Sequence, residues 1–168
     1  MTAFTIRPAT VADAPALSAI VQTLIAEWLV PDGHVGATER MRHEHSAAAI
    51  AGHIAEGWPY WLAECESAGT PSIIAYIALR PPTHLFNCYV SESWQGRGVG
   101  TALWTFLREQ VRASAREKMI ANDELVVTVS AALRSQAIYL RWGFASDGTA
   151  QCHEGLWFQP MRCLLPLA

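Results

Sequence analysis

The chain is 168 residues long, which is enough to bury most of its apolar surface within a single domain spanning residues 1–168. Hydrophobic residues make up 51% of it and charged residues 16%, so the composition excludes a disordered protein. The formal net charge of -3 provides no bulk attraction to nucleic acid or to anionic lipid, and we expect neither as a partner.

Four cysteines are scattered along the chain, with no CxxC pair and no matched histidine spacing. They indicate neither a zinc site nor a disulfide framework, and they are typical of thiols in a reducing cytoplasm. The N-terminus lacks the basic and apolar regions of a leader, and no apolar run approaches the roughly 20 residues that span a bilayer. We therefore expect a soluble, cytoplasmic protein without a metal.

The N-terminal third predicts a strand followed by two helices. Residues 4–8 alternate in polarity like a strand, and Asp13 can cap a helix whose apolar positions continue to Trp28. After a break at 30–36, residues 37–57 are rich in alanine and predict one further helix that ends at its terminal glycine.

The middle of the chain predicts a hairpin and then a strand. Residues 60–66 and 72–80 are two β-rich runs separated by a turn composition, which favours antiparallel pairing. Residues 84–90 predict another strand, which leads directly into a glycine-rich segment and an amphipathic helix.

The C-terminal part alternates between strand and helix signals. Residues 124–130 are almost continuously apolar, as expected of a strand that is covered on both faces. Residues 133–144 predict a helix closed by Gly143, and residues 156–167 predict a last strand broken near Pro160. We predict a single α/β domain with a mixed, mostly antiparallel sheet of six or seven strands and about four helices.

The glycine-rich segment predicts an anion-binding loop. Gly96, Gly98 and Gly100 permit positive φ angles and close approach of a ligand, while the first turn of the following helix offers unpaired N–H groups. The sequence fits neither of two well-known phosphate-binding motifs. It is not a Walker A motif, because no lysine follows the glycines, and it is not the dinucleotide-binding fingerprint, because the glycines are spaced GxGxG rather than GxGxxG.

The segment Gln95 to Gly100 instead resembles the Q/R-x-x-G-x-G/A signature of the GNAT superfamily of N-acetyltransferases. The order of predicted elements along nearly the whole chain agrees with that family, although the specific motifs lie between Val90 and Phe144. The resemblance implies a GNAT fold whose fourth and fifth strands splay apart, and acetyl-CoA as co-substrate. It implies that Tyr89 and Val90 line the pantetheine arm, with the thioester carbonyl at Val90, and that loop amides hold the pyrophosphate; these loop residues are Gln95, Gly96, Arg97, Gly98, Val99, Gly100 and Thr101.

A second motif lies about 45 residues further along. The run from Tyr139 to Phe144 resembles the family's helix that carries a tyrosine four residues before Gly-Phe, and the resemblance implies that Tyr139 protonates the leaving thiolate. A phenol with a reference pKa of about 10 is protonated at neutral pH and can donate. Ala132 stands where many relatives carry an asparagine that binds the pantetheine, so that contact is missing here.

The general base has two candidates. His84 begins its strand at about the place where some family members hold a catalytic glutamate, and an imidazole of pKa near 6.5 suits deprotonation of an amine. Water is the alternative, since many relatives use only water. By period-2 alternation, Asn87 and Tyr89 lie on the opposite face of the strand from His84 and could position such a water.

Two further clusters have simpler interpretations than a functional one. His43 and His45 lie two residues apart, so on a helix they face apart and cannot easily chelate one ion; a solvated face is the better interpretation. Trp58 and Tyr60 lie near the place where the family builds its acceptor pocket, and either core packing or a pocket wall suits them.

We therefore predict an acetyl-CoA-dependent N-acetyltransferase that moves the acetyl group directly to a primary amine, and a homodimer is possible. The alternative is a non-catalytic acyl-CoA-binding or sensor protein of the same fold. The acceptor has no motif in the sequence. Four acidic residues could attract a cationic amine, although each suits an ordinary surface position: Glu27, Glu39, Glu44 and Glu64.

Overall fold

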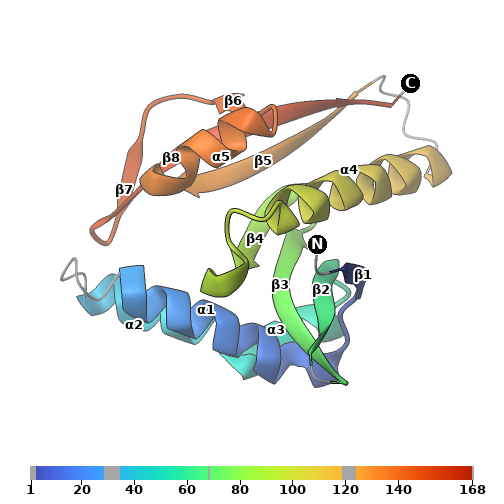
Figure 1. Cartoon of the computed structure of the whole chain (residues 1–168). Helices are drawn as coiled ribbons and strands as arrows, with labels where there is room; N and C mark the ends of the chain where they lie inside the picture. The colour runs from blue at the N-terminus through green and yellow to red at the C-terminus, as the bar shows by residue number, and fades with distance from the viewer. Residues whose placement is uncertain (1–2, 29–34, 68, 119–123, 168) are drawn as a thin grey trace.

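The computed structural model describes residues 3–28, 35–67, 69–118 and 124–167. Its strands form one sheet in the order β1-β2-β3-β4-β5-β8-β6, and β7 pairs with β8. Figure 1 shows the N-terminal elements through β3 on one side of β4 and the elements from β5 onward on the other. The strand β4 therefore lies at the centre of the molecule.

The N-terminal half contains three antiparallel strand pairs, formed by β1 to β4. β1 (Phe4–Pro8) pairs with β2 (Tyr60–Ser67), and β2 pairs with β3 (Thr70–Arg80), which in turn pairs with β4 (His84–Val90). The predicted hairpin and the end of the fourth strand at Val90 are confirmed.

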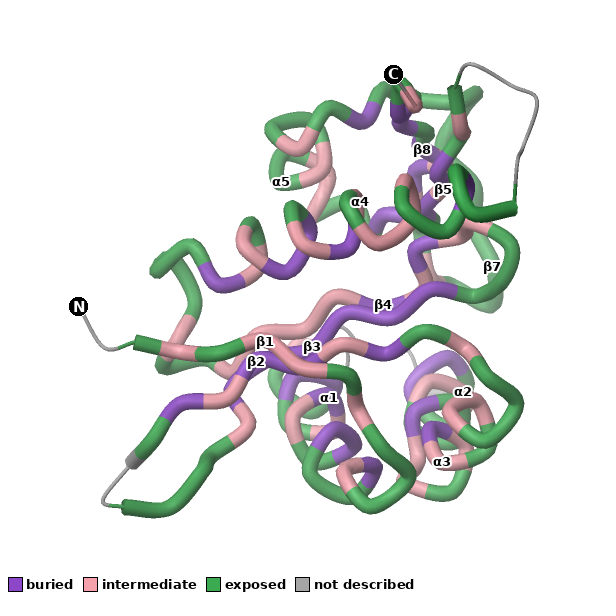
Figure 2. The backbone as a smooth tube through the Cα atoms, turned by 90° about the vertical axis from the view of Figure 1, so that its right-hand side faces the viewer, coloured by how far each residue is buried: buried purple, intermediate pink, exposed green. Residues whose placement is uncertain are grey.

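Helices pack on both faces of this half of the sheet. α1 (Ala14–Trp28) contacts α3 (Ala47–Ala55) on one face, and α4 (Val99–Glu117) lies on the other (Figure 1). Figure 2 shows the helix faces that turn toward the sheet as buried. One apolar cluster, with Leu103 and Trp104, lies under α4, and a second, with Leu17, lies under α1 and α3.

The single helix predicted over residues 37–57 is wrong. The chain forms two helices there, α2 (Val35–Glu44) and α3, separated at His45 and Ser46. Ser46 adopts an extended conformation, and its hydroxyl accepts a hydrogen bond from the Ala49 N–H at 3.2 Å, which begins a new helix. With this break, the described residues contain five α-helices rather than about four. The predicted break at 30–36 lies mostly outside the described residues.

β4 and β5 (Glu124–Ala132) form a short parallel pair. Their register comprises only His84 with Thr128 and Leu85 with Val129, although both strands continue beyond it. All other strand pairs among the described residues are antiparallel. The predicted mixed sheet, with its fourth and fifth strands splayed apart, is confirmed.

The C-terminal half is built around a long strand. β8 (Leu156–Pro166) pairs continuously with β5 and carries two short strands on its other edge, β6 (Ala145–Ser146) and β7 (Gln151–His153). The predicted interruption near Pro160 is wrong. The Pro160 carbonyl accepts from the Asp147 N–H at 2.8 Å, on the edge of β8 that faces away from β5 and between the β6 and β7 pairings. The N–H that a proline lacks would point to this same edge, so β8 loses no hydrogen bond to β5.

Two shorter helical segments complete the fold. α5 (Gln136–Arg141) follows a 3₁₀ turn (Leu133–Ser135), and Gly143 ends it with a φ of 92°, as the sequence predicted. No described helix is both long and apolar enough to cross a bilayer.

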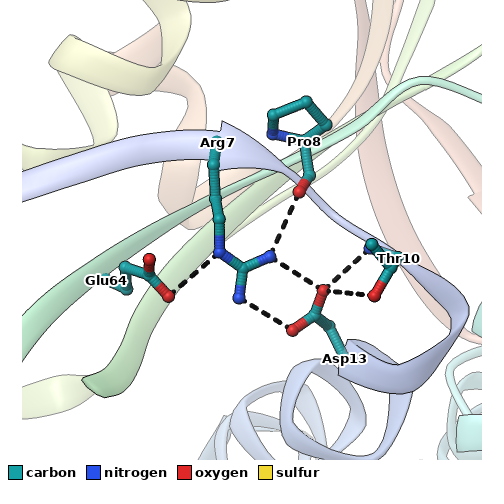
Figure 3. Close-up of polar contacts among 5 residues, drawn as sticks. All are labelled: Arg7, Pro8, Thr10, Asp13 and Glu64. Atoms are coloured by element: carbon teal, nitrogen blue, oxygen red, sulfur yellow. Dashed lines mark hydrogen bonds and ion pairs between the residues drawn. The ribbon is translucent and has the colours of Figure 1, made fainter. Parts of the chain in front are cut away.

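The junction between β1 and α1 is held by a charged cluster (Figure 3). Arg7 donates two hydrogen bonds of 2.9 Å to the Asp13 carboxylate and forms an ion pair of 3.1 Å with Glu64. Asp13 also accepts from the N–H and the hydroxyl of Thr10, which occupies the N-cap position that the sequence assigned to Asp13. The hydrogen bond from Arg7 holds the pKa of Asp13 well below its ordinary value.

Replacing the Asp13 carboxylate should destabilise the protein. We expect Asp13→Ala to lower the free energy of unfolding by about 1–2 kcal/mol, because it removes both a helix-start acceptor and the partner of Arg7. Chemical denaturation measures this difference. Asp147→Ala is the matched control, because Asp147 and Arg162 are half exposed and 3.9 Å apart, and its effect should stay within about 0.5 kcal/mol.

The Asp13 contribution should also depend on pH. A carboxyl whose pKa is lowered by folding stabilises the protein above its unfolded pKa of about 4 and loses that effect as the pH falls further. The stability difference between the parent and Asp13→Ala should therefore shrink from pH 5 downward. A difference that stays constant down to pH 2 would contradict this assignment.

Candidate active site

A cleft of about 1060 Å³ opens where β4 and β5 diverge. It brings together all but one of the site residues expected from the sequence. The exception is Arg97, which is not on the cleft wall and instead places its guanidinium 5.4 Å from the centre of the Trp94 ring. The residues on the wall are His84, Tyr89, Val90, Gln95, Gly96, Gly98, Val99, Gly100, Thr101 and Tyr139.

The glycine loop ends at the start of α4. Gly98 occupies the N-cap position with a φ of 82°, a conformation that L side chains rarely adopt. The first helical hydrogen bond runs from the Ala102 N–H to the Gly98 carbonyl at 2.9 Å. The N–H groups of Val99, Gly100 and Thr101 therefore have no partner within the helix, and they form an electropositive end suited to an anion.

A tryptophan fixes this loop against α5. A Cβ atom at Gly100 would lie 3.4 Å from the Trp142 ring, in van der Waals contact with it, so the ring packs directly over this first turn of the helix. The Trp142 indole donates to the Thr101 hydroxyl at 3.1 Å, and its carbonyl accepts from the Trp104 indole at 3.2 Å. Sequence analysis missed Trp142, although it lies inside the Tyr139 to Phe144 motif.

The end of β4 presents backbone polar groups to the open side of the cleft. The Ser91 N–H donates to Ile74 of β3 at 2.9 Å, so by alternation the N–H and carbonyl of Val90 point away from β3, toward the side that β5 has left. The Gln95 side-chain amide donates to the Val90 carbonyl at 3.0 Å. The Val90 carbonyl is therefore occupied, while the Val90 N–H faces the cleft and can donate to a ligand.

Tyr139 lies on the wall of the same cleft as this donor. Its ring packs edge-on against Trp142 and Phe144, at centroid distances of 5.4 and 5.5 Å. Part of the side chain stays open to the cleft, yet its surroundings are dense enough that burial raises the pKa of the phenol, and Cys88 and Tyr89 raise it further. The phenol is therefore protonated at neutral pH.

The neighbouring thiol is not a nucleophile at neutral pH. Burial raises the pKa of Cys88 to about 12, so its thiolate form is scarce. This favours direct transfer over a covalent intermediate.

His84 lies where β4 and β5 are still paired. Its Nδ1 lies 2.9 Å from the Thr128 hydroxyl, and burial, with a smaller effect of Arg80, lowers its pKa to about 4. The side chain is therefore neutral at pH 7 but is a weaker base than an ordinary imidazole. From His84 to Val90 the strand covers roughly 20 Å, so His84 cannot contact a group that reacts beside Val90 directly.

A bulge in β4 changes which residues share a face. Leu79 pairs with Leu85 and Ala78 pairs with Asn87, which leaves Phe86 as the extra residue. Leu85 faces the cluster under α4, so His84 lies on the same face as Tyr89. The expectation that His84 faces away from Tyr89 is therefore wrong, because simple alternation does not hold across the bulge.

A buried histidine stands opposite this bulge. His45 stacks on Phe86 with ring centroids 5.7 Å apart, and its Nε2 lies 2.9 Å from the Asn87 side-chain oxygen. Its Nδ1 lies 2.8 Å from the Met41 carbonyl. The solvated position expected for His45 is wrong, because the break between α2 and α3 turns its ring inward; His43 is exposed as expected.

The polar contacts continue behind Asn87. The Tyr60 hydroxyl lies 3.0 Å from His53 Nδ1, and Asn87 lies near enough to Tyr60 to counter part of the rise that burial causes in its pKa. The Asn87 amide nitrogen reaches hydrogen-bond geometry with none of the described groups. Trp58 stacks on His53 at 4.1 Å, so Trp58 and Tyr60 pack behind the cleft wall rather than forming it.

Comparison of the sequence with models of known protein families identifies the family of this chain. A model of the acetyltransferase (GNAT) domain matches residues 31–165. The chain belongs to the GNAT family. It is an acetyl-CoA-dependent acetyltransferase, and the cleft between β4 and β5, with the free amide groups at the start of α4, fits an anionic CoA. No curated protein sequence matches the chain.

Solved structures share this fold over nearly their whole length. A GCN5-related N-acetyltransferase from Rhodopseudomonas palustris has 22% identity and a TM-score of 0.73, with 97% of this chain and 96% of the other covered. The PaiA N-acetyltransferase from Thermoplasma acidophilum, solved in complex with coenzyme A, has 14% identity and a TM-score of 0.73 over 96% and 98%. The ribosomal-protein-S18-alanine N-acetyltransferase from Escherichia coli has 18% identity and a TM-score of 0.64 over 99% and 96%.

The left-handed conformation at Gly98 should matter for CoA affinity. We expect Gly98→Ala to weaken CoA binding by about 10-fold, because an alanine is strained at a φ of 82° and must move the first turn of α4. Gly52→Ala is the matched control, since nothing lies within 4 Å of its Cβ position in α3 and CoA affinity should not change. Titration calorimetry with CoA measures both, and equal affinities for the two variants would contradict the role of the loop.

Proposed function

We propose that the protein transfers the acetyl group of acetyl-CoA directly to the primary amine of an acceptor, within the cleft between β4 and β5. The observation that carries this proposal is the Val90 N–H, which points into the cleft near the protonated phenol of Tyr139. Acyl transfer from a thioester needs a donor for the oxyanion and an acid for the departing sulfur, and these two groups can supply both.

The roles of the binding residues follow from their positions. The N–H groups of the loop and first turn, from Gly96 to Thr101, hold the pyrophosphate, whereas the Gln95 N–H already donates to the Glu92 carbonyl at 3.1 Å. The edge of β4 at Tyr89 and Val90 lies along the pantetheine arm. Gln95 has a positioning role: its side-chain amide donates to the Val90 carbonyl and so holds the backbone of Val90, whose own N–H faces the cleft. Arg97 lies off the cleft wall, so its part is limited to the backbone of the loop.

The reaction forms a C–N bond and breaks the C–S bond of the thioester. Of the two protons that an ammonium acceptor gives up, one leaves to solvent and one replaces the proton that Tyr139 donates to the CoA sulfur. Burial, which raises the pKa of Tyr139, keeps the phenol protonated at neutral pH and so ready to donate, and it is recovered in that form after each turnover.

We infer that water carries the proton away from the amine. His84 lies on the same face of β4 as Tyr89, but its lowered pKa and its distance from Val90 favour a role in orienting such a water rather than direct deprotonation. The cytoplasmic location and the homodimer remain predictions from the sequence and the family resemblance.

Removal of the Tyr139 hydroxyl distinguishes an enzyme from a sensor. We expect Tyr139→Phe to lower kcat by about 100-fold or more, with little change in KM for acetyl-CoA, as for the loss of a general acid. Release of CoA thiol with a panel of amines measures this effect. Tyr76→Phe is the control, because that buried hydroxyl has no partner among the described residues and its loss should leave kcat unchanged.

A non-catalytic acyl-CoA sensor would give a different result. It would bind acetyl-CoA tightly and release no thiol with any amine. Tyr139→Phe would then have no effect to measure, and the proposed function would be abandoned.

The pH dependence tests the base. If water takes the proton, log kcat/KM should rise with pH until the acceptor amine is neutral, and His84→Gln should lower kcat/KM by less than about 5-fold without shifting this profile. A loss above about 100-fold, together with disappearance of an acid limb near the His84 pKa of about 4, would identify His84 as the base instead.

A further inference from the structure

The fold separates the four acidic residues that could receive an amine. Glu64 pairs with Arg7 at 3.1 Å and lies on β2, which β3 separates from β4. Glu27 and Glu39 are exposed and do not line the cleft. Glu44, at the end of α2, does line it, and it is the one carboxylate among the described residues on the wall.

Glu44 lies close to the proposed reaction centre. Its charge contributes to raising the pKa of Tyr89, which directly precedes Val90 on β4. The next residue along the chain, His45, stacks on Phe86 and contacts Asn87 at the bulge of the same strand. Both observations place the end of α2 against the acceptor face of β4.

The Glu44 carboxylate is available to a ligand. Its side chain is 45% exposed, and its ion pair with Arg40 is long, at 3.7 Å. Arg40 is engaged more closely by Glu154, at 2.5 Å, across the cleft in the turn between β7 and β8. Arg40 therefore compensates the charge of Glu44 only in part.

The rest of the acceptor end is apolar and largely aromatic. Its walls come from α1, α2, the bulge of β4 and the start of β8, which enclose the cleft beyond the splay. The Trp28 ring is fixed by the Arg134 guanidinium, 4.4 Å above its centre, and 56% of Trp157 is exposed. The apolar members of this wall are Leu24, Ile25, Trp28, Met41, Phe86 and Trp157.

Other acceptor classes match this wall less well. A polyamine needs several carboxylates, and the described wall offers one. An α-amino acid needs a free cation for its carboxylate near its amine. Of the arginines on the described wall, Arg40 pairs with Glu154 and Arg134 stacks on Trp28. Arg80 ends β3 opposite His84, roughly 20 Å of strand from Val90, and Arg141 ends α5, the helix that carries Tyr139, on the CoA side of the cleft.

We propose that the acceptor is a monoamine attached to a flat apolar or aromatic group, with its ammonium held by Glu44 and its apolar body against Trp28, Phe86 and Trp157. This inference rests on the proposed acetyl transfer. A single carboxylate at the end of an apolar pocket fixes the orientation of such a molecule, while apolar contact supplies the affinity.

The acceptor class is tested on the purified chain at saturating acetyl-CoA, by release of CoA thiol. The amines are 2-phenylethylamine, tryptamine, ethylamine, spermidine and glycine. We expect kcat/KM for 2-phenylethylamine to exceed that for spermidine, glycine and ethylamine by about 10-fold or more, because only the aromatic amines bury a large apolar body next to the carboxylate.

Substitutions test the wall residues. Glu44→Gln should raise KM for 2-phenylethylamine by about 10-fold, as expected for loss of one charge-assisted contact, and leave KM for acetyl-CoA unchanged. Glu27→Gln and Glu39→Gln are the matched controls and should change neither constant. Trp157→Leu, at an exposed position that does not endanger folding, should raise KM for 2-phenylethylamine more than KM for ethylamine.

The outcomes separate the two proposals. Thiol release with none of the amines, despite binding of CoA, overturns the proposed function. Preferred turnover of spermidine or glycine leaves that function standing and overturns the acceptor class. Equal KM values for Glu44→Gln and its two controls overturn the role of Glu44.

Discussion

The site depends on the early separation of β4 and β5. Two pairs of residues hold these parallel strands together, after which each continues without the other. A strand that loses its neighbour inside a protein exposes backbone groups that must find another partner. At Val90 the carbonyl finds the Gln95 side chain, while the N–H remains directed into the cleft. The cleft and its donor therefore have one physical origin, since any extension of the pairing would close both.

Contacts of Trp142, which follows α5, join the two motifs of the CoA side. Its indole packs over Gly100 and donates to Thr101, and its backbone carbonyl accepts from the Trp104 indole, so one residue joins the glycine loop to the segment that carries Tyr139. The loop and the proposed acid come from segments on either side of β5 in the chain, and catalysis needs both to be held at a fixed separation.

The opposite wall is organised by the bulge in β4. The extra residue, Phe86, lets Phe86 and Asn87 both reach the ring of His45, and the break between α2 and α3 brings that ring inward. Glu44 then ends α2 at the cleft. A strand without the bulge and an unbroken helix would have directed these side chains away from the cleft. The cleft wall at this end would then lack both Phe86 and Glu44.

The sequence by itself determined the donor side of this protein. Glycine conformational freedom and a helix start are local properties, and they predicted an anion-binding loop. The resemblance of two short motifs to the GNAT family added the expectations of CoA and of Tyr139 as the acid. Only the tertiary structure decided the acceptor side. The bulge at Phe86, the burial of His45 and the choice of Glu44 among four similar carboxylates depend on strand register and on helix packing between segments about 40 residues apart, which no local pattern encodes.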